Sequence, residues 1–411
     1  MSIGEDPAIG MGWKAPATAE ELRLWLVGTV APLWARNVAN PARAGYAEYL
    51  DHEGIPVPQK ERTTLVTARL VYSFSHLYLL GAPDEVLRAA EHGFEFLSRH
   101  CQDPADGGFW HSVSSGGSPI GGWKDSYDQA FVLFATAWFH RATGSMAALD
   151  LADRVADFMD RQLVDPEFGG YLERVPADAK AAPFRRQNPH MHLLEAYHAL
   201  YEATGSPRWS ERAQAIVELF LRHFFDRETG TLIEYFAGDW GAAAGVPGQL
   251  REPGHHFEWG WLLLHHHRIL GDKRVIEPAR RLLAFADRRG IDRLPGFVSA
   301  AHDEVDAQGA VLKASKLFWP QTEALKASLA RAEVLGEASA MAEARERLAV
   351  LFRHYILGGD GRWRNRIARD GSPLPDELPT RVFYHFVLAL AEFLRVERQV
   401  SRPAVTMERT S

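Results

Sequence analysis

The chain lacks the cysteines and the basic charge that mark several classes of protein. Cys101 is the single cysteine among 411 residues, so neither an internal disulfide nor a paired-cysteine zinc or redox site can form. Lys and Arg number 46 against 53 Asp and Glu, which gives a formal net charge of −7. Because the chain offers no basic surface for phosphate backbones, we expect no nucleic-acid partner.

Long apolar segments are absent as well. The longest, residues 131–139, is far shorter than the roughly 20 residues that cross a bilayer, so we expect no membrane partner. The N-terminus has neither the basic stretch nor the apolar segment of a signal peptide. A reducing compartment suits a chain with one cysteine, and we therefore predict a cytoplasmic protein.

What the chain does have is the composition of a folded protein and an internal repeat. Hydrophobic residues make up 46% and charged residues 24%, which excludes a disordered chain. A glycine next to an aromatic or apolar residue recurs at intervals of 60 to 66 residues, which indicates six repeated units. These glycines are Gly45, Gly108, Gly170, Gly230, Gly296 and Gly361.

Each unit has the pattern of a short β-hairpin followed by two helices. In the first unit, residues 62–80 show helical spacing, 81–83 break it, and 85–97 resume it. The sixth unit lacks a second helix, while the N-terminal helix 19–36 lacks a partner, so the two can complete each other. We therefore predict an all-α fold, an (α/α)6 barrel with short β-hairpins at one end. It comprises residues 19–398 as a single domain, between tails 1–18 and 399–411.

In such a barrel, the starts of the six inner helices surround one pocket. A single histidine on an apolar helix is usually a core residue, but three at one depth beside Glu and Arg predict a functional site. Paired residues three or four apart share a helix face. The candidates in chain order are Arg62 and Arg69, Lys124 and Tyr127, Asn188 and His192, His255 and Glu258, Trp319 and Gln321, then Arg381 and His385.

A metal centre is the rival interpretation of the histidines, because imidazole and carboxylate are good ligands. The sequence contains no His-Glu-x-x-His motif, and the adjacent His255 and His256 point about 100° apart on a helix. The glycines of residues 116–122 match no phosphate-binding loop. We therefore expect neither a metal nor a cofactor.

Four segments of the chain carry a family resemblance. Residues 187–196, 252–259, 316–325 and 381–386 resemble motifs of the N-acylglucosamine 2-epimerase superfamily, and the resemblance covers about residues 20–397. It implies an (α/α)6 barrel that isomerises or epimerises sugars without a metal. The four ordered motifs are specific for the superfamily but not for one member.

The resemblance also implies catalytic roles for five residues. His385 would remove the C2 proton of an aldose, and His255 would be the second acid or base and assist ring opening. Arg69, His192 and Glu258 would handle the enediolate oxygens. These roles suit the chemistry, because an enediolate needs cations and hydrogen-bond donors in a dry pocket, and a histidine exchanges protons near neutral pH.

The substrate pocket of the resemblance would be shaped by Tyr127, Asn188, Trp319 and Gln321. Phe318 stands where many members have a second tryptophan, which affects the substrate rather than the chemistry. Segments 187–196 and 252–259 and the compact loop 237–252 look closer to mannose isomerases than to N-acyl epimerases. We therefore predict that D-mannose is converted to D-fructose, and D-lyxose to D-xylulose as a side reaction.

Other functions stay open at this point. An aldose 2-epimerase of the mannose, cellobiose or N-acylglucosamine type uses the same residues, and so does a sulfoquinovose isomerase. A glycoside hydrolase needs two carboxylates, for which Glu258 and Asp128 are the candidates. A non-catalytic helical scaffold is the least suited to so many polar groups at one end. The expected partner is a small monosaccharide, and the protein itself is a monomer or homodimer.

Overall fold

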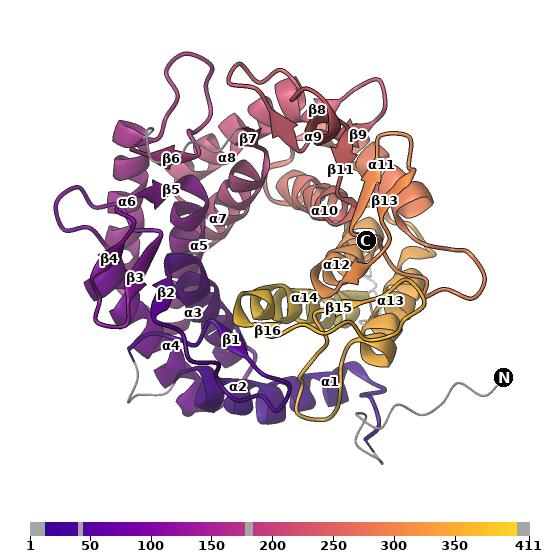
Figure 1. Cartoon of the computed structure of the whole chain (residues 1–411), viewed down its shortest axis with the longest axis horizontal. Coiled ribbons are helices and arrows are strands. Elements are labelled where there is room, and N and C mark those ends of the chain that lie inside the picture. The colour runs from indigo at the N-terminus through magenta and orange to yellow at the C-terminus, as the bar shows by residue number, and fades with distance from the viewer. Residues whose placement is uncertain (1–12, 40–43, 177–183, 401–411) are drawn as a thin grey trace, which may run out of the picture.

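The predicted (α/α)6 barrel is confirmed in the structure, a computed structural model that describes residues 13–39, 44–176 and 184–400. Figure 1 looks down the barrel axis onto two concentric rings of helices. Neighbouring inner helices pack against one another around the ring, and α14 packs against α3 to close it. The inner helices are α3 (Thr64–Leu79), α5 (Ser126–Thr143), α7 (Asn188–Thr204), α10 (Pro253–Leu270), α12 (Phe318–Leu335) and α14 (Phe383–Val400).

The outer ring is completed by the N-terminal helix, as the unpaired sixth unit predicted. This helix consists of α1 (Ala19–Trp25), the π-helical turn η1 (Leu26–Val30) and α2 (Ala31–Val38). The other outer helices are α4 (Asp84–Phe96) with η2 (Leu97–Cys101), α6 (Met146–Gln162), α8 (Pro207–Leu219) with η3 (Phe220–Phe224), η4 (Lys273–Val275) with α11 (Ile276–Phe285) and η5 (Ala286–Gly290), and α13 (Ala340–His354).

The inner helices are buried on nearly all sides, whereas the outer helices bury one face. Thr63 caps α3 and Asp125 caps α5, each through a side-chain oxygen that accepts a backbone N–H. Four inner helices end at a glycine with φ between 65° and 74°, a left-handed conformation that a side chain disfavours. These glycines are Gly144, Gly205, Gly271 and Gly336.

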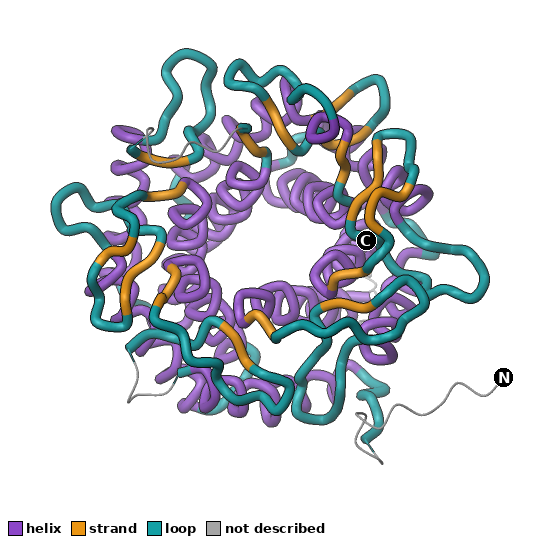
Figure 2. Tube along the Cα trace, in the orientation of Figure 1, coloured by secondary structure: helices purple, strands orange, loops and turns teal. Residues whose placement is uncertain are grey.

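The short strands lie at one end of the barrel, over the starts of the inner helices (Figure 2). They are β1 (Tyr49–Leu50), β2 (Glu61–Thr63), β3 (Ser112–Ser114), β4 (Pro119–Ile120), β5 (Lys124–Asp125), β6 (Arg174–Val175), β7 (Arg185–Arg186), β8 (Phe225–Asp226), β9 (Thr231–Leu232), β10 (Tyr235–Phe236), β11 (Leu250–Arg251), β12 (Glu304–Asp306), β13 (Val311–Lys313), β14 (Lys316–Leu317), β15 (Arg366–Ile367) and β16 (Leu378–Pro379). The remaining short elements are α9 (Val246–Gln249) and η6 (Thr380–Val382).

In addition to the predicted hairpins, the strands also form pairs between units. Several pairs join consecutive units, such as β5 with β6, β7 with β10 and β14 with β15. The pair of β1 with β16 joins the first unit to the last, with Tyr49 opposite Pro379 and Leu50 opposite Leu378. The strand layer therefore closes the ring at the same place as the helices do.

Buried cations fasten the strands in front of three inner helices. Lys124 Nζ lies 2.7 Å from Asp103, Arg185 Nη1 lies 2.7 Å from Asp165, and Lys316 Nζ lies 3.2 Å from Asp292. Each carboxylate belongs to the turn that follows an outer helix. Lys124, a candidate pocket residue from the sequence, is thus a fastening residue outside the pocket. Arg62 is another, since its guanidinium donates to the carbonyls of Ala44, Gln59 and Glu61.

A second repeated contact clamps each of four inner helices to the preceding hairpin. A Gln or His side chain accepts a hydrogen bond from one backbone N–H of that hairpin. The pairs are Gln129 with Phe109 (2.9 Å), His190 with Tyr171 (2.9 Å), His256 with Leu232 (3.0 Å) and Gln321 with Ala301 (2.7 Å). We call these four side chains the clamp residues. Gln129 and Gln321 also donate to the carbonyl of the same hairpin residue.

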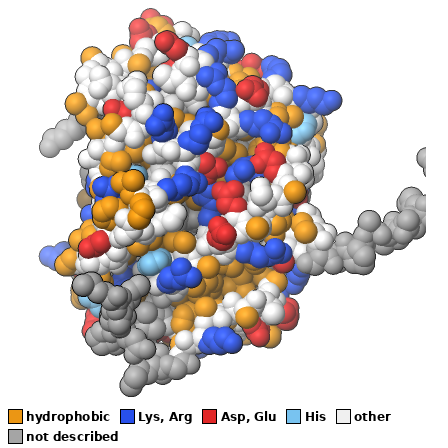
Figure 3. Space-filling view, turned by 90° about the vertical axis from the view of Figure 1, so that its right-hand side faces the viewer, with side chains coloured by type: hydrophobic (Ala, Val, Ile, Leu, Met, Phe, Trp, Pro, Cys, Tyr) orange, Lys and Arg blue, Asp and Glu red, His pale blue; other side chains and the backbone are white. Residues whose placement is uncertain are grey.

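The outer surface carries both signs of charge. On the side shown in Figure 3, acidic and basic side chains are interspersed with apolar ones. Between α11 and α13, Arg331 and Arg347 both pair with Asp287 and Glu343. Within the described residues, none of the helices combines the length and the apolar character needed to span a bilayer.

Candidate active site

Six side chains at the same position of the six inner helices meet at the barrel axis. Their numbers differ by 62, 61, 66, 65 and 62, which is the period of the repeat. The Arg69 guanidinium lies 4.1 Å from the centre of the Phe131 ring, and that ring lies 4.5 Å from His192. Polar atoms of the other members lie within 4.8 Å of one another in overlapping groups. We call Arg69, Phe131, His192, Glu258, Glu323 and His385 the axial ring.

A cavity of about 370 Å³ opens above the axial ring at the hairpin end. It is lined by eight of the nine residues predicted for the site, namely Arg69, Tyr127, Asn188, His192, His255, Glu258, Trp319 and His385. The mouth of the cavity is lined in addition by Arg186, Glu252, Asn365, Arg366 and Arg381. The repeat therefore brings residues that are far apart in the sequence to one pocket.

Gln321 does not lie in this cavity. Its amide is occupied by the backbone of Ala301 and by the carbonyl of Leu317, because it is a clamp residue. It is the equivalent of His190 and His256, not of His192 and Glu258. Gln321, which was predicted to bind substrate, thus lies at a position that holds the hairpin on the helix.

His385 is held by a buried carboxylate. Its Nδ1 lies 2.7 Å from Glu323 Oε1, and Glu323 is fully buried. A carboxylate accepts the proton of Nδ1, which leaves the lone pair on Nε2. Burial lowers the pKa of His385 well below its usual value, and the charges of Arg69 and Lys326 lower it further. At neutral pH this ring is therefore uncharged and can act as a base.

His255 has the opposite environment. Its Nδ1 lies 2.9 Å from Glu234 Oε2 and 3.6 Å from Glu252 Oε2. Burial opposes a charge on the ring, but Glu252 and Glu234 raise the pKa of His255 to about 10. The Nδ2 atom of Asn188 lies 3.1 Å from Nε2, and a 180° turn of this amide brings its unpartnered Oδ1 to the same place as the acceptor of the second ring proton. His255 is therefore a cation that can act as an acid.

The other members of the pocket supply a cation and neutral donors. Arg69 donates to the hydroxyl of Tyr127 at 2.8 Å and to the carbonyl of Arg381 at 3.2 Å, and its Nε has no partner within the described residues. Burial, followed by the charge of Glu323, raises the pKa of Glu258 well above its usual value. Glu258 is thus protonated and can donate a hydrogen bond.

His192 is also fixed by a carboxylate. Its Nδ1 lies 3.1 Å from Glu195 Oε2, and the hydroxyl of Tyr384 donates to the same oxygen. Burial lowers the pKa of His192 to about 4, although Glu195 opposes this effect. The ring is neutral at pH 7, with Nε2 available to a sugar hydroxyl.

One turn below the axial ring, the next residues of the same helices form a floor. We call Tyr72, Phe134, Glu195, Trp261, Lys326 and Leu388, each three residues beyond an axial-ring residue, the floor ring. Four of its members, Phe134, Glu195, Trp261 and Leu388, line a second cavity of about 410 Å³. The floor ring therefore separates the candidate site from the other end of the barrel.

Sequence reasoning missed several residues of the site. Glu323 could have been found, because it follows Glu258 by 65 residues and precedes His385 by 62, in step with the repeat. Lys326 could have been found next, because it lies three residues, about one helical turn, after Glu323. Glu234, in contrast, lies between β9 and β10 in an irregular segment, where no periodic signal exists.

Three groups of side chains bring enough nitrogen and oxygen atoms together to be tested as metal sites. In the group of Glu234, Glu252 and His255, the histidine is a cation and has no free lone pair. In the group of Glu258, Glu323 and His385, the ammonium of Lys326 lies 2.7 Å from Glu323 and already supplies a positive charge. The donors of these two groups are therefore arranged for proton transfer.

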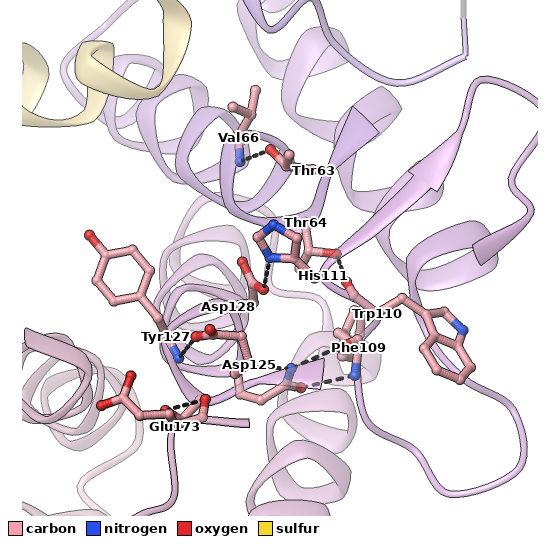
Figure 4. A network of polar contacts seen from close by, with 12 residues as sticks. Thr63, Thr64, Val66, Phe109, Trp110, His111, Asp125, Tyr127, Asp128 and Glu173 are labelled. Carbon is pink, nitrogen blue, oxygen red and sulfur yellow. Dashed lines mark hydrogen bonds and ion pairs between the residues drawn. The ribbon is translucent and has the colours of Figure 1, made fainter. Parts of the chain in front are cut away.

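The carboxylate pair that the sequence suggested for a glycoside hydrolase, Glu258 and Asp128, is not assembled. Asp128 lies outside the cavity, and its Oδ2 is 2.7 Å from His111 Nδ1 (Figure 4). In the same view the ring of Tyr127 extends away from this contact, while its backbone N–H donates to Asp125. Glu258 and Asp128 therefore do not face each other across this cavity.

The family model for N-acylglucosamine 2-epimerase matches residues 45–389. The chain belongs to this family. It is 32% identical over 392 residues to a mannose-6-phosphate isomerase of Rhizobium meliloti (strain 1021), with 93% of this chain and 98% of the relative covered. It is 29% identical over 340 residues to a D-mannose isomerase of Thermobifida fusca, with 77% and 81% covered.

Solved structures agree with this assignment. The cellobiose 2-epimerase of Spirochaeta thermophila DSM 6192 superposes with a TM-score of 0.83 at 26% identity, with 93% of this chain and 97% of that chain covered. Together, the family and these relatives identify the protein as an enzyme that isomerises or epimerises sugars.

Proposed function

We propose that the protein is an aldose–ketose isomerase that converts D-mannose to D-fructose, and D-lyxose to D-xylulose, without a metal. The observation that carries the proposal is the contrast between two histidines in one cavity: Nδ1 of His385 contacts the single carboxylate of Glu323, whereas Nδ1 of His255 lies near two carboxylates. Groups whose surroundings push their pKa values apart are the natural acid and base of a proton transfer. Similarity to proteins named as mannose isomerases supports the choice of sugar.

The reaction begins with ring opening, in which the cationic His255 donates a proton to the ring oxygen as the bond from that oxygen to C1 breaks. The neutral ring of His255 then takes the proton of the C1 hydroxyl, which gives the aldehyde and restores the cation. Nε2 of His385 then removes the C2 proton, and the C–H electron pair forms the C1–C2 double bond of an enediolate. Arg69 and the protonated Glu258 stabilise the negative oxygen in a water-poor cavity. His385 returns the proton to C1, and His192 assists the proton shift from O2 to O1.

A 2-epimerase differs only in the last step. If His255 delivered a proton to C2 from the face opposite His385, mannose would give glucose instead of fructose. The presence of both histidines is compatible with either product, so the product has to be measured.

A phosphorylated substrate is a second candidate, favoured by the charge at the mouth of the cavity. Arg366 and Arg381 line the mouth in addition to Arg69 deeper inside, and Arg186, which also lines it, pairs with Glu173 at 2.6 Å. Of the two carboxylates of the cavity, Glu258 has a raised pKa because it is buried, and Glu252 pairs with the cationic His255 at 3.6 Å. This positive mouth suits a phosphate on C6, and one relative is named a mannose-6-phosphate isomerase.

The deciding experiment is NMR of chelator-treated enzyme in deuterium oxide with D-mannose or D-mannose 6-phosphate. Fructose with deuterium at C1 supports the isomerase, whereas glucose before fructose contradicts it in favour of the epimerase. A much higher kcat/KM for the phosphate ester that falls after Arg366→Gln selects the second candidate. Absence of turnover and of C2 exchange with both sugars contradicts both.

A further inference from the structure

Lys326 is buried in the protein interior, where a charged side chain is energetically unfavourable. It belongs to the floor ring on α12, and its side chain is 0% exposed. Its ammonium lies 2.7 Å from Glu323 Oε2 and 4.0 Å from the centre of the Trp261 ring. A buried charge is retained only with a partner, because leaving water costs several kcal/mol for each ion.

The partner of Lys326 is also the partner of His385. One oxygen of Glu323 faces Nδ1 of His385, and the other faces Lys326. The three groups form a chain from the floor of the barrel to the proposed base. Lys326 does not line the cavity, so it reaches the substrate only through this chain.

We propose that Lys326 is a positioning residue that keeps Glu323 ionised, and so holds the ring proton of His385 on Nδ1 and the lone pair on Nε2. The inference rests on the proposed role of His385 as the base. It makes Lys326 a fixed internal cation that sets the tautomer of a catalytic ring.

The physical reason is the balance of charge around Glu323. Burial raises the pKa of Glu323, and the ammonium of Lys326 opposes this shift. Without the ammonium, Glu323 would take up a proton and donate it to Nδ1, which would force the histidine proton onto Nε2. The other charged or titratable groups near His385 are Arg69 on α3, His192 and Glu195 on α7, His255 and Glu258 on α10, and Tyr384 on α14.

Loss of Lys326 should shift the acidic limb of kcat/KM to higher pH, and two different effects both act in this direction. A protonated Glu323 must first lose its proton before His385 regains the useful tautomer. If Glu323 stays ionised, removal of the positive charge instead makes His385 easier to protonate. In both cases the base is competent only at higher pH, so the acidic limb of kcat/KM moves to higher pH.

The test compares Lys326→Met and Lys326→Gln, which remove the charge, with Lys326→Arg, which keeps it. We expect the neutral variants to lower kcat by about 10² or more, the contribution of a general base, with KM changed by less than about threefold. In the neutral variants the acidic limb of kcat/KM should move to higher pH. Lys326→Arg should recover most of kcat. Unchanged kcat and an unchanged limb in a folded neutral variant would overturn the proposal.

Lys316→Met is the matched control. Lys316 is also 0% exposed, but it pairs with Asp292 and with the carbonyls of Val298 and Arg369 outside the cavity. Its loss should lower the melting temperature and leave the pH limb in place. If the Lys326 variants behave like this control, the role of Lys326 is structural and the proposal is wrong.

A readout without substrate separates this inference from the proposed function. Nitrogen-15 NMR of the imidazoles distinguishes the two tautomers and the cation, with His385 assigned by loss of its signals in His385→Gln. Wild type and Lys326→Arg should show Nδ1 protonated, and Lys326→Gln should show Nε2 protonated or the cation. An identical pattern in all three overturns the inference, even if no sugar is found to react.

Discussion

At the scale of single residues, adjacent histidines in this chain have different duties that depend on the helix face. His255 lies in the cavity, whereas His256 next to it clamps the helix to Leu232. His190 and His192 divide in the same way. Because two equivalent clamp positions hold glutamine, this division can be tested with a substitution that the fold already uses.

We expect His385→Gln and His255→Gln to lower kcat by about 10² to 10⁴, since each removes an acid or base. His190→Gln and His256→Gln should retain kcat within about threefold, because glutamine makes the same contact at Gln129 and Gln321. Steady-state kinetics on the identified sugar checks both sets. Equal losses in the two sets would contradict the division.

The pH dependence of catalysis should have an alkaline limit set by His255. Its pKa is raised to about 10, so the acid form is present at neutral pH and is lost as the pH rises through that value. Glu252 raises this pKa, and Glu252→Gln should therefore move the alkaline limb of kcat/KM to lower pH. A profile between about pH 6 and pH 11 tests this, and a limb that stays in place would assign it to another group.

At the scale of elements, the buried cation–carboxylate pairs fasten strands to turns. Burial opposes ionisation of Asp292, but hydrogen bonds from Arg369 and Lys316 lower its pKa to about 2. The stabilisation is therefore present above the usual value of 3.8 and is lost as the pH falls through about 2. The lowering corresponds to about 2 kcal/mol.

We expect Asp292→Asn to lose about 2 kcal/mol of unfolding free energy at pH 7, and the difference from wild type to shrink below about pH 4. Urea unfolding at several pH values measures it. Arg345→Ala, which breaks a surface pair with Glu397, is the control and should change the free energy by less than about 1 kcal/mol. A loss that does not depend on pH would mean that packing, not charge, explains the effect.

The elements also show where sequence reasoning succeeds and where it stops. The glycine period and helical spacing predicted the helix pairs, because each repeats a local signal. The pairing of β1 with β16 has no such signal, since two-residue strands show no alternation and their partners are far apart in the chain. On α12 the clamp position, Gln321, lies only two residues before the axial-ring position, Glu323, and both are polar. The sequence alone therefore did not show which of the two faces the cavity.

At the scale of the whole molecule, the repeat explains why polar side chains from six helices meet in one cavity at the barrel axis. Six equivalent positions project Arg, Phe, His, Glu, Glu and His into one ring, so a single substitution changes one group of the ring while the helical frame stays the same. The family, the fold and eight cavity residues could be predicted from the sequence. The protonation of His255 and His385 could not, because it depends on carboxylates such as Glu234 that other elements bring close.

Because the ring of helices is closed, we expect that the barrel does not depend on where along the ring the chain is opened. Residues 15–20 and Leu22 line the same cleft as Phe393 and Glu397, so α1 and α14 are neighbours. A circular permutant that joins the two ends by a flexible linker and opens the exposed turn at Ser115 and Gly116 should therefore refold into the same barrel. We expect it to keep the wild-type kcat within about tenfold and to melt at a lower temperature; an aggregated or inactive product would show that folding has to start from the N-terminal helix.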